Sequence, residues 1–424
     1  MKYRVREQNE LKPSGVEWLG DIPKDWKKGK IKYYLSLVSG IFTQKTDFGL
    51  YNLYGANGVI GVTDNYNINE KSIIIGRVGS AGYINEAEKE SWISDNALIV
   101  KIKNQNNYRY IYYLLKSLNL NRFASFNAQP LISATTINNL EVFIPTVITQ
   151  QKIANFLDEK SKIFDEAISK KEQLISKLEL AKQSLISEVV TGKLKVVEQS
   201  SKLQTIKREK NELKPSGVEW LGDIPKDWKL TKLKYLGDAI IGLTYSPTDV
   251  VDKNEGKLVL RSSNVQNKRI TFEDNVYVKS EIPKKLLTKI DDILICSRNG
   301  SRNLIGKNAL ITENSQDLTF GAFMTLFRSK YNKYLFYIFN SDIFEAQSAS
   351  FLSSTINQLT TGNLNNFKIV LPSLEEQQKI SKYLDEKLIH FDNTIEKTKQ
   401  SITKLKEAKE ALISQVVTGK IEVL

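Results

Sequence analysis

The sequence REQNELKPSGVEWLGDIPKDWK occupies residues 6–27, and it returns as residues 208–229 with one change, Lys210 in place of Gln8. A second repeat, 227 residues apart, starts at Gln150 and at Gln377, and both of its copies contain VVTGK. The chain is therefore two copies of one plan, each with an entry segment, a middle segment and a tail. The first middle segment is 28–144 and the second is 230–371, which is longer.

The two tails are predicted to be long helices. Gly192 and Gly419 suit C-terminal caps, and Ser373 with Glu376 has the pattern of a capping box. Apolar residues recur in both tails at spacings of three, four and seven, which is typical of a coiled-coil seam. The predicted seam consists of Leu157, Phe164, Ile168, Ile175, Leu178 and Leu185 in the first tail, and Leu384, Phe391, Ile395, Ile402, Leu405 and Leu412 in the second.

The middle segments are predicted to be mixed α/β. Short apolar runs indicate buried strands at 72–76, 97–100, 292–296 and 309–311, and aromatic-rich helices are expected at 108–118 and 333–344. If a two-fold relates the copies, the long helices must run antiparallel. The expected fold is thus α/β (mixed α+β), with two globular domains joined by two long antiparallel coiled-coil helices and an internal pseudo-two-fold repeat.

This plan predicts five parts of the chain. They are an entry segment with the first globular domain (1–149), the first long helix (150–192), a polar linker (193–210), an entry segment with the second globular domain (211–376), and the second long helix (377–424).

Composition points to a polyanionic partner. Lys and Arg number 61 against 48 Asp and Glu, a net charge of +13, which favours nucleic acid first and an anionic membrane second. With one Cys and one His, the chain cannot form an internal disulfide or a Cys/His zinc site. No run reaches the ~20 apolar residues of a membrane span, and the N-terminus lacks an apolar signal core, so a cytoplasmic protein is expected.

No catalytic residue or metal ligand stands out. The glycine-rich loop Gly76–Gly82 lacks the acidic residue of a dinucleotide site, and no phosphate-loop motif occurs. The acids of Asp158–Lys160 and Asp385–Lys387 fall in the first turns of the long helices, where they favour the helix dipole. Cys296 is interpreted as a buried small apolar residue, and His390 as an exposed or seam position of a helix.

The candidate contacts to nucleic acid are small, polar and basic residues in loops of the middle segments. Arg can donate two hydrogen bonds to guanine and Asn can pair with adenine, although each loop could equally be a solvated surface. The candidates are Lys45, Arg77 and Ser80 in the first segment, and Arg261, Asn264, Arg298, Asn299 and Arg302 in the second.

These motifs resemble the specificity subunit of type I restriction–modification systems over nearly the whole chain. The resemblance rests on PSGVEWLGDIPKDW (13–26 and 215–228), on QQKI starting five residues beyond Pro145 and Pro372, and on the shared VVTGK. It implies two target recognition domains, each reading one half of a split, asymmetric site in double-stranded DNA. It also implies that the long helices act as a spacer between these halves.

The resemblance also implies partners. Two modification subunits would bind S-adenosylmethionine and methylate adenine, restriction subunits would use ATP and Mg, and this chain would bind no cofactor and catalyse nothing. Two alternatives stay open: a specificity region related to fused nuclease–methyltransferases, and a coiled-coil scaffold that does not bind DNA.

Overall fold

The structure is a computed structural model of residues 1–424, and it describes all of them except 1, 17–18, 127–128 and 352–356. The chain folds into two compact units, one of residues 1–172 with 399–424 and one of residues 173–398. These divisions fall inside the long helices, whereas the predicted domain boundaries lay at the helix ends. Each unit contains part of both helices because those parts pack on its own core.

Each unit contains a four-stranded antiparallel sheet with the same strand order. The first sheet runs β5 (Leu35–Ser39), β11 (Ala97–Ile102), β8 (Ser72–Gly76) and β9 (Ile84–Ala87). The second runs β20 (Asp238–Ile241), β29 (Met324–Arg328), β26 (Ile293–Cys296) and β27 (Asn308–Leu310). The four strands predicted from apolar runs are β8, β11, β26 and β27, and the central β8 and β26 are wholly buried.

A second sheet in each unit contains one parallel pair. In the first unit its order is β10 (Trp92–Ile93), β6 (Tyr51–Gly55) and β7 (Gly58–Thr63), with β10 parallel to β6. In the second it is β28 (Thr319–Phe320), β22 (Lys257–Leu260), β25 (Val276–Val278) and β21 (Val250–Val251), with β28 parallel to β22. The extra strand β21 accounts for part of the greater length of the second middle segment.

Smaller elements frame these sheets at matching places in the two copies. The strand pairs are β2 (Leu11–Pro13) with β3 (Asp21–Pro23), β17 (Leu213–Pro215) with β18 (Asp223–Pro225), β4 (Lys27–Lys30) with β14 (Glu141–Ile144), and β19 (Lys229–Lys232) with β30 (Lys368–Leu371). Two further hairpins lie at different places in the two copies: β12 (Ser125–Phe126) with β13 (Pro130–Leu131) comes after α1, and β23 (Val265–Gln266) with β24 (Arg269–Ile270) comes after β22. Short helices α2 (Ala134–Asn138) and α6 (Thr361–Asn365) precede β14 and β30.

The predicted short helices are found, with one correction. Helix α1 spans Tyr108–Ser117, close to its expected limits. The helix expected over 333–344 is instead two helices, α4 (Asn332–Ile338) and α5 (Asp342–Phe351). Between them, the Asn340 and Ser341 side chains donate to the carbonyls of Phe336 and Ile338. These local bonds compete with helix continuation, and they end the first helix.

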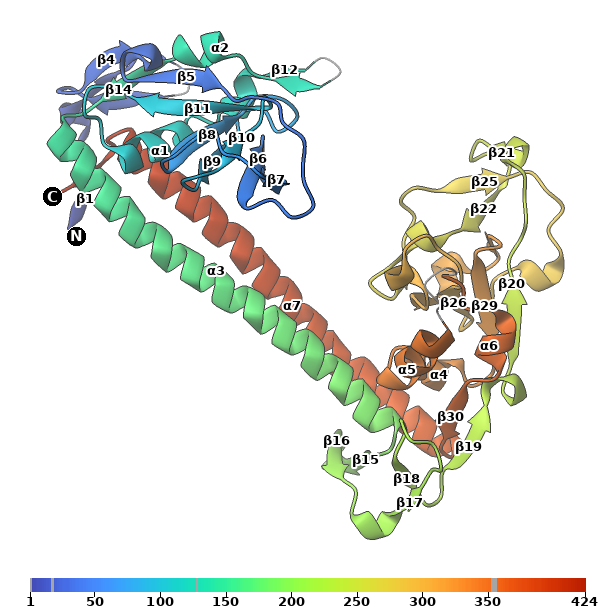
Figure 1. The fold of residues 1–424 in the computed structure, drawn as a ribbon. Coiled ribbons are helices and arrows are strands. Elements are labelled where there is room, and N and C mark those ends of the chain that lie inside the picture. The colour runs from blue at the N-terminus through green and yellow to red at the C-terminus, as the bar shows by residue number, and fades with distance from the viewer. Residues whose placement is uncertain (1, 17–18, 127–128, 352–356) are drawn as a thin grey trace. The chain divides into compact units, whose positions relative to one another are not determined.

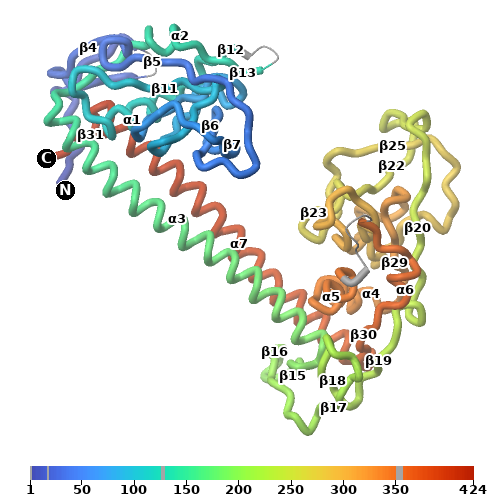
Figure 2. Tube along the Cα trace, in the orientation of Figure 1, coloured from blue at the N-terminus to red at the C-terminus, as the bar shows by residue number. Residues whose placement is uncertain are grey.

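The tails form the long helices α3 (Val147–Val190) and α7 (Leu374–Val417), which run side by side and antiparallel within each unit (Figures 1 and 2). Lys409 Nζ lies 2.7 Å from Asp165 Oδ2 in the first unit, and Lys182 pairs with Asp392 in the second. The two ion pairs are equivalent because each of these residues has its counterpart 227 positions away. The predicted antiparallel arrangement and the internal repeat are therefore confirmed.

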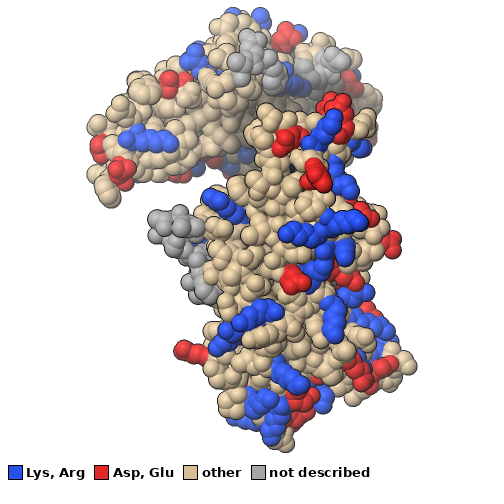
Figure 3. Space-filling view, turned by 90° about the vertical axis from the view of Figure 1, so that its right-hand side faces the viewer, with Lys and Arg blue, Asp and Glu red and all other residues tan. Residues whose placement is uncertain are grey.

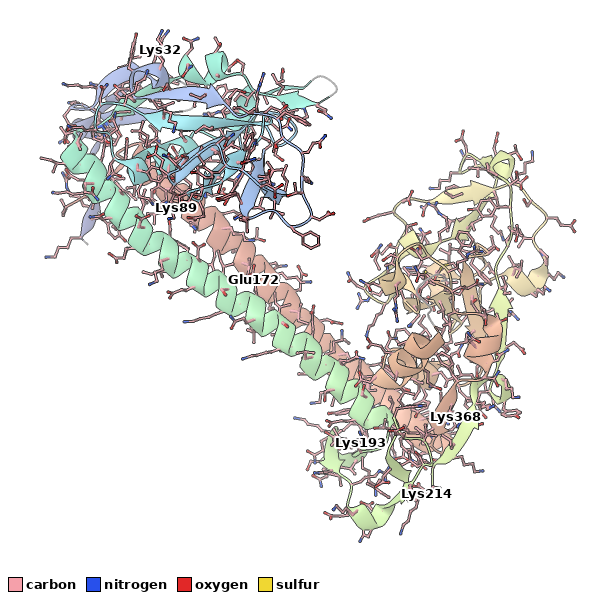
Figure 4. The ribbon with its side chains drawn as sticks, in the orientation of Figure 1. Lys32, Lys89, Glu172, Lys193, Lys214 and Lys368 are labelled. Carbon is pink, nitrogen blue, oxygen red and sulfur yellow. The ribbon has the colours of Figure 1, made fainter. Side chains whose placement is uncertain are left out.

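The seam positions face inward. Every predicted seam residue of the two helices is buried or half-buried, whereas apolar residues off that stripe, such as Ile163 and Leu180, are exposed. Figure 4 places Glu172 midway along α3 and Lys193 beyond its end. No helix among the described residues is both long enough and apolar enough to cross a membrane.

The helix ends confirm one capping prediction and correct another. Gly192 and Gly419 have φ angles of +76° and +75°, and a Cβ there would lie 2.3 Å and 2.4 Å from the rings of Pro225 and Pro23. Glycine is thus required at the C-terminal ends of both long helices, because φ is positive there and because the proline rings lie too close for a side chain. At the start of α7 the Ser373 hydroxyl does accept a hydrogen bond from the Glu376 amide.

The Glu376 carboxylate does not reach back toward Ser373. Its oxygens accept hydrogen bonds from Arg208 Nη2 at 2.5 Å and from Trp228 Nε1 at 2.8 Å. The predicted capping box is therefore only half formed, because a guanidinium and an indole from the entry segment are stronger partners for this carboxylate.

The segment 193–210 is ordered, although it was predicted as a linker. It forms the hairpin of β15 (Leu194–Gln199) and β16 (Lys202–Lys207), with Ser200 and Ser201 at positive φ in its turn. Val196 is buried against the second unit's core. An equivalent ladder joins β1 (Tyr3–Val5) to β31 (Ile421–Val423) in the first unit.

Candidate nucleic-acid interface

A polar loop follows the central strand of each four-stranded sheet, and the same backbone hydrogen bonds hold it in both units. The Arg77 amide donates to the Asn96 carbonyl at 2.8 Å, and the Ser297 amide donates to the Phe323 carbonyl at 3.0 Å. The Arg77 carbonyl accepts from the Ile132 amide at 3.0 Å, as the Ser297 carbonyl does from Leu359 at 2.8 Å. Residues 77–78 and 297–298 thus share one set of backbone hydrogen bonds, which we call the backbone frame, and they differ in their side chains.

This frame shows that the predicted arginines of the two loops are not equivalent. Arg77 corresponds to Ser297, and Val78 corresponds to Arg298. Arg77 donates from Nη1 to Ser39 Oγ at 3.1 Å, toward the edge strand β5. Because neighbouring residues of an extended chain point to opposite sides, Arg77 and Arg298 leave the frame in different directions.

In the second unit, Arg298 is exposed and is stacked on an aromatic ring. Its guanidinium carbon lies 5.2 Å from the centre of the Phe323 ring, which is itself exposed. Asn299, half-buried, donates from Nδ2 to Ser262 Oγ at 3.2 Å, which ties this loop to the one after β22. Arg302 is exposed in the same loop. Arg298, Asn299 and Arg302 thus all lie in the loop after β26.

In the first unit, a close approach of two loops shapes the surface. A Cβ on Gly76 would lie 2.2 Å from the Ser80 carbonyl oxygen and 2.5 Å from that of Ala56, so only glycine fits. Ser80 is half-buried and its carbonyl accepts from the Tyr83 amide, so its main chain closes the turn. Lys45 is exposed in the loop between β5 and β6.

Two predicted contacts in the loop after β22 have structural roles. Asn264 is fully buried, and its Nδ2 donates to the carbonyls of Thr271 and Glu273. Its prediction as a nucleic-acid contact was wrong, because all of its polar side-chain atoms face the protein. Arg261 is half-buried, and its Nη2 lies 2.9 Å from Asp274 Oδ2, so a nucleic acid would have to displace this carboxylate.

The sequence interpretation missed the residues that support these loops. Phe323 is the most informative, because a large apolar side chain that is 59% exposed beside an arginine is unusual on a globular surface. A cluster of exposed apolar residues in the first unit, around β5 to β7, was also missed. It contains Ile41, Phe42, Phe48, Leu50, Val59 and Ile60. No periodicity marks exposed apolar residues of this kind, so only the folded structure identifies them.

The acidic residues near the helix starts fasten the middle segments to the long helices. Asp158 Oδ1 accepts from the Tyr113 hydroxyl at 2.7 Å and from Arg109 Nη2 at 2.6 Å. Tyr337 and Asp385 make the equivalent contact in the second unit. Burial and the Asp158 carboxylate raise the pKa of Tyr113 to about 12. The repeated Tyr–Asp pairs were visible in the sequence, but their contact was not.

The remaining candidates for chemistry are accounted for. Cys296 is fully buried in β26, where burial raises the pKa of its thiol, and His390 is exposed on α7. Among the residues that the structure describes, no group of three or more His, Cys, Asp and Glu side chains could hold a metal ion. Figure 3 shows Lys and Arg side chains spread over the visible face among fewer Asp and Glu, in keeping with the net charge.

Comparison with known proteins agrees with this arrangement. A family model described as "Type I restriction modification DNA specificity domain" matches twice, over residues 21–180 and 225–407. The chain is 28% identical to the type I restriction enzyme EcoKI specificity subunit of Escherichia coli, over 47% of this chain and 44% of that protein. It is 25% identical to the MjaVIII specificity subunit of Methanocaldococcus jannaschii, over 95% of this chain and 94% of that protein.

A solved structure shares the fold. It comes from a study of complex assembly and conformational transition of the type I R-M system, and it superposes with a TM-score of 0.67. The superposition covers 94% of this chain and 99% of the other, at 13% sequence identity. The two matches of the family model each cover one middle segment with part of a long helix, as the internal repeat requires.

Proposed function

Because the chain belongs to the family of type I restriction–modification DNA specificity domains, we propose that it recognises a bipartite, asymmetric site in double-stranded DNA. Each middle segment reads one half of this site. One observation carries the proposal: the two units hold the loops after β8 and β26 with the same backbone bonds, yet present Val78 in one and Arg298 in the other. A shared frame with different side chains suits one docking geometry and two base sequences.

The duplicated parts of the chain support docking of two modification subunits. The entry segments are nearly identical, so they offer one surface twice. Just beyond them, Tyr33 and Tyr235 are exposed at equivalent positions, with the ammonium groups of Lys32 and Lys234 at 5.5 Å and 5.0 Å from their rings. Two equal surfaces on one chain fit two copies of one partner better than two different partners.

Catalysis is assigned to the partners. In this proposal the modification subunits bind S-adenosylmethionine and methylate the DNA, and restriction subunits use ATP and Mg. This chain binds DNA through loops rich in Arg, Lys and Asn, and it supplies the sequence preference. A role of this kind is exercised where the DNA is, in the cytoplasm.

The proposal is tested by selecting duplexes from a randomised DNA library with the full-length chain assembled with its modification subunit. Two short conserved blocks separated by unconserved positions are expected. Affinity for the selected duplex should fall steeply with salt, since phosphate contacts release counterions. A single contiguous block would contradict two-part recognition, and no salt-dependent binding would favour a scaffold that does not bind DNA.

A further inference from the structure

We propose that Arg298 is the specificity-determining residue of the second middle segment, and that it reads a guanine through the edge of its guanidinium. This inference rests on the proposed function and deepens it, because it names one residue, one base and one half of the site. Arg donates two parallel hydrogen bonds to the O6 and N7 of guanine in the major groove.

The backbone of Arg298 is fixed from two sides. Its amide donates to the Phe323 carbonyl at 3.0 Å, and it forms an antiparallel bridge with Gln358. Its carbonyl accepts from the buried Cys296 thiol at 3.8 Å. The starting point of the side chain is therefore set by the sheet and not by the loop alone, which suits a precise contact.

The side chain is also oriented, while its polar edge stays available. The guanidinium lies over the Phe323 ring, and a stacked guanidinium can still donate in its own plane. Among the described residues no carboxylate pairs with Arg298, whereas Arg261 is paired with Asp274 and Arg328 with Asp292. Arg298 is thus an exposed and oriented arginine of the second middle segment, and it has no acidic partner among the described residues.

The first middle segment cannot make this contact. The positions equivalent to Arg298, Phe323 and Gln358 hold Val78, Asn96 and Leu131. Valine has no donor, and no aromatic ring lies at the equivalent of Phe323. The guanine contact therefore belongs to the half-site of the second segment alone.

The test compares Arg298→Ala, Arg298→Lys and wild type, each as the full chain assembled with its modification subunit, by selection from randomised duplexes. We expect Arg298→Ala to lose the preference for guanine at one position of one half-site, by about 5- to 150-fold, and Arg298→Lys to lose part of it, because an ammonium lacks the planar fork of a guanidinium. The other half-site should be unchanged. Lys330→Ala is the matched control, because the Lys330 ammonium lies 5.1 Å from the Tyr331 ring centre in the same segment. It should alter no base preference.

The alanine variant distinguishes base reading from phosphate binding. If Arg298 contacts phosphate, Arg298→Lys keeps the wild-type preferences and Arg298→Ala weakens binding to all sequences equally, which overturns the inference. Unchanged preferences in both variants overturn it as well. The wild-type arm reports separately on the proposed function: a bipartite wild-type site without an effect of Arg298 refutes only this inference. Melting temperatures equal to that of wild type exclude loss of folding as the cause.

Discussion

Tyr3 pairs with Val423 in the antiparallel ladder of β1 and β31, in the same register in which Thr205 pairs with Val196 in the hairpin of β15 and β16. Tyr3 and Thr205 are 202 residues apart, as are the two entry segments, and Val196 and Val423 are 227 apart, as are the two tails. The ladder between the two ends of the sequence is therefore the open counterpart of the closed hairpin. The order of elements along the chain is therefore nearly circular.

This nearly circular order of elements predicts that the chain tolerates circular permutation. A second copy of the linker Glu198–Lys202 placed between Leu424 and Met1 should close the first ladder as it closes the hairpin, and new ends opened between Ser200 and Ser201 should leave both strands paired. We expect a folded protein with wild-type DNA selectivity, measured by circular dichroism and duplex selection. A permutant that fails to fold would show that the two ladders are not interchangeable.

A fragment of residues 1–205 is predicted to form a homodimer. Removing the rest uncovers the part of the first core that the end of α7 fills with Ile413, Val416 and Val417. The end of α3 offers the same residue types in the same order, as Ile186, Val189 and Val190. Burying these and the seam residues of a second copy at ~1.5–3 kcal/mol each should outweigh the loss of association entropy.

Sedimentation measures this outcome. A dimer at micromolar concentration is expected, and it should select palindromic duplexes because two copies of the first middle segment would be related by a two-fold. A fragment that stays monomeric at tens of micromolar would refute the interchangeability of the two helix ends.

Glu376 is predicted to stabilise the second unit strongly. It neutralises Arg208, whose side chain is only 5% exposed, and it accepts from Trp228 as well. Glu376→Ala leaves that guanidinium buried with the Glu212 carboxylate, 3.9 Å from Nη1, as its remaining described partner, and should lower the free energy of unfolding by about 3 kcal/mol. Glu375→Ala is the control, because its side chain is 78% exposed and Lys379 is its one ion-pair partner among the described residues. The control should cost less than about 0.5 kcal/mol in urea titrations, and equal losses in the two variants would refute the role of Glu376.

Lys268 is predicted to make stability depend on pH. It lies in the turn between β23 and β24, where burial, with Lys182 nearby and Asp392 opposing, lowers its pKa from 10.5 to about 8. Between these two pKa values the unfolded chain binds more protons than the folded chain. The free energy of unfolding therefore falls as the pH falls through this window, and the destabilisation by Lys268 is complete below about pH 8.

Lys268→Gln should therefore raise stability at pH 7 by about 1–2 kcal/mol, and this gain should shrink as the pH approaches 10. The exposed Lys279→Gln serves as control and should show no such gain. Thermal unfolding across this pH range measures both, and a Lys268→Gln gain that does not vary with pH would argue against the shifted pKa.

Much of the architecture could be predicted because it rests on repetition and periodicity. The repeats gave the two units, the heptads gave α3 and α7, and apolar runs gave β8 and β26 to within a residue. Gly192 and Gly419 were recognisable because few residues other than glycine adopt the left-handed backbone conformation that follows a helix. The hairpin 194–207 was missed, since only the alternation of Leu194 and Val196 marks it among many lysines.

The candidate interface was less accessible to prediction because it depends on registers between distant segments. Arg77 and Arg298 both follow a buried strand, yet the bonds to Asn96 and Phe323 show that they occupy neighbouring rather than equivalent positions. Asn264 has a side chain suited to adenine, but a loop asparagine can equally satisfy its own backbone, and burial decides between these roles.

If each middle segment reads its own half of the DNA site, an exchange of one segment should change the matching half alone. Residues 230–371 would be replaced by the corresponding segment of a related specificity subunit, and the DNA sites selected or methylated by the assembled complex would be sequenced. One half of the site is expected to change to that of the donor, while the other half stays as it was. A change in both halves, or in neither, would contradict it.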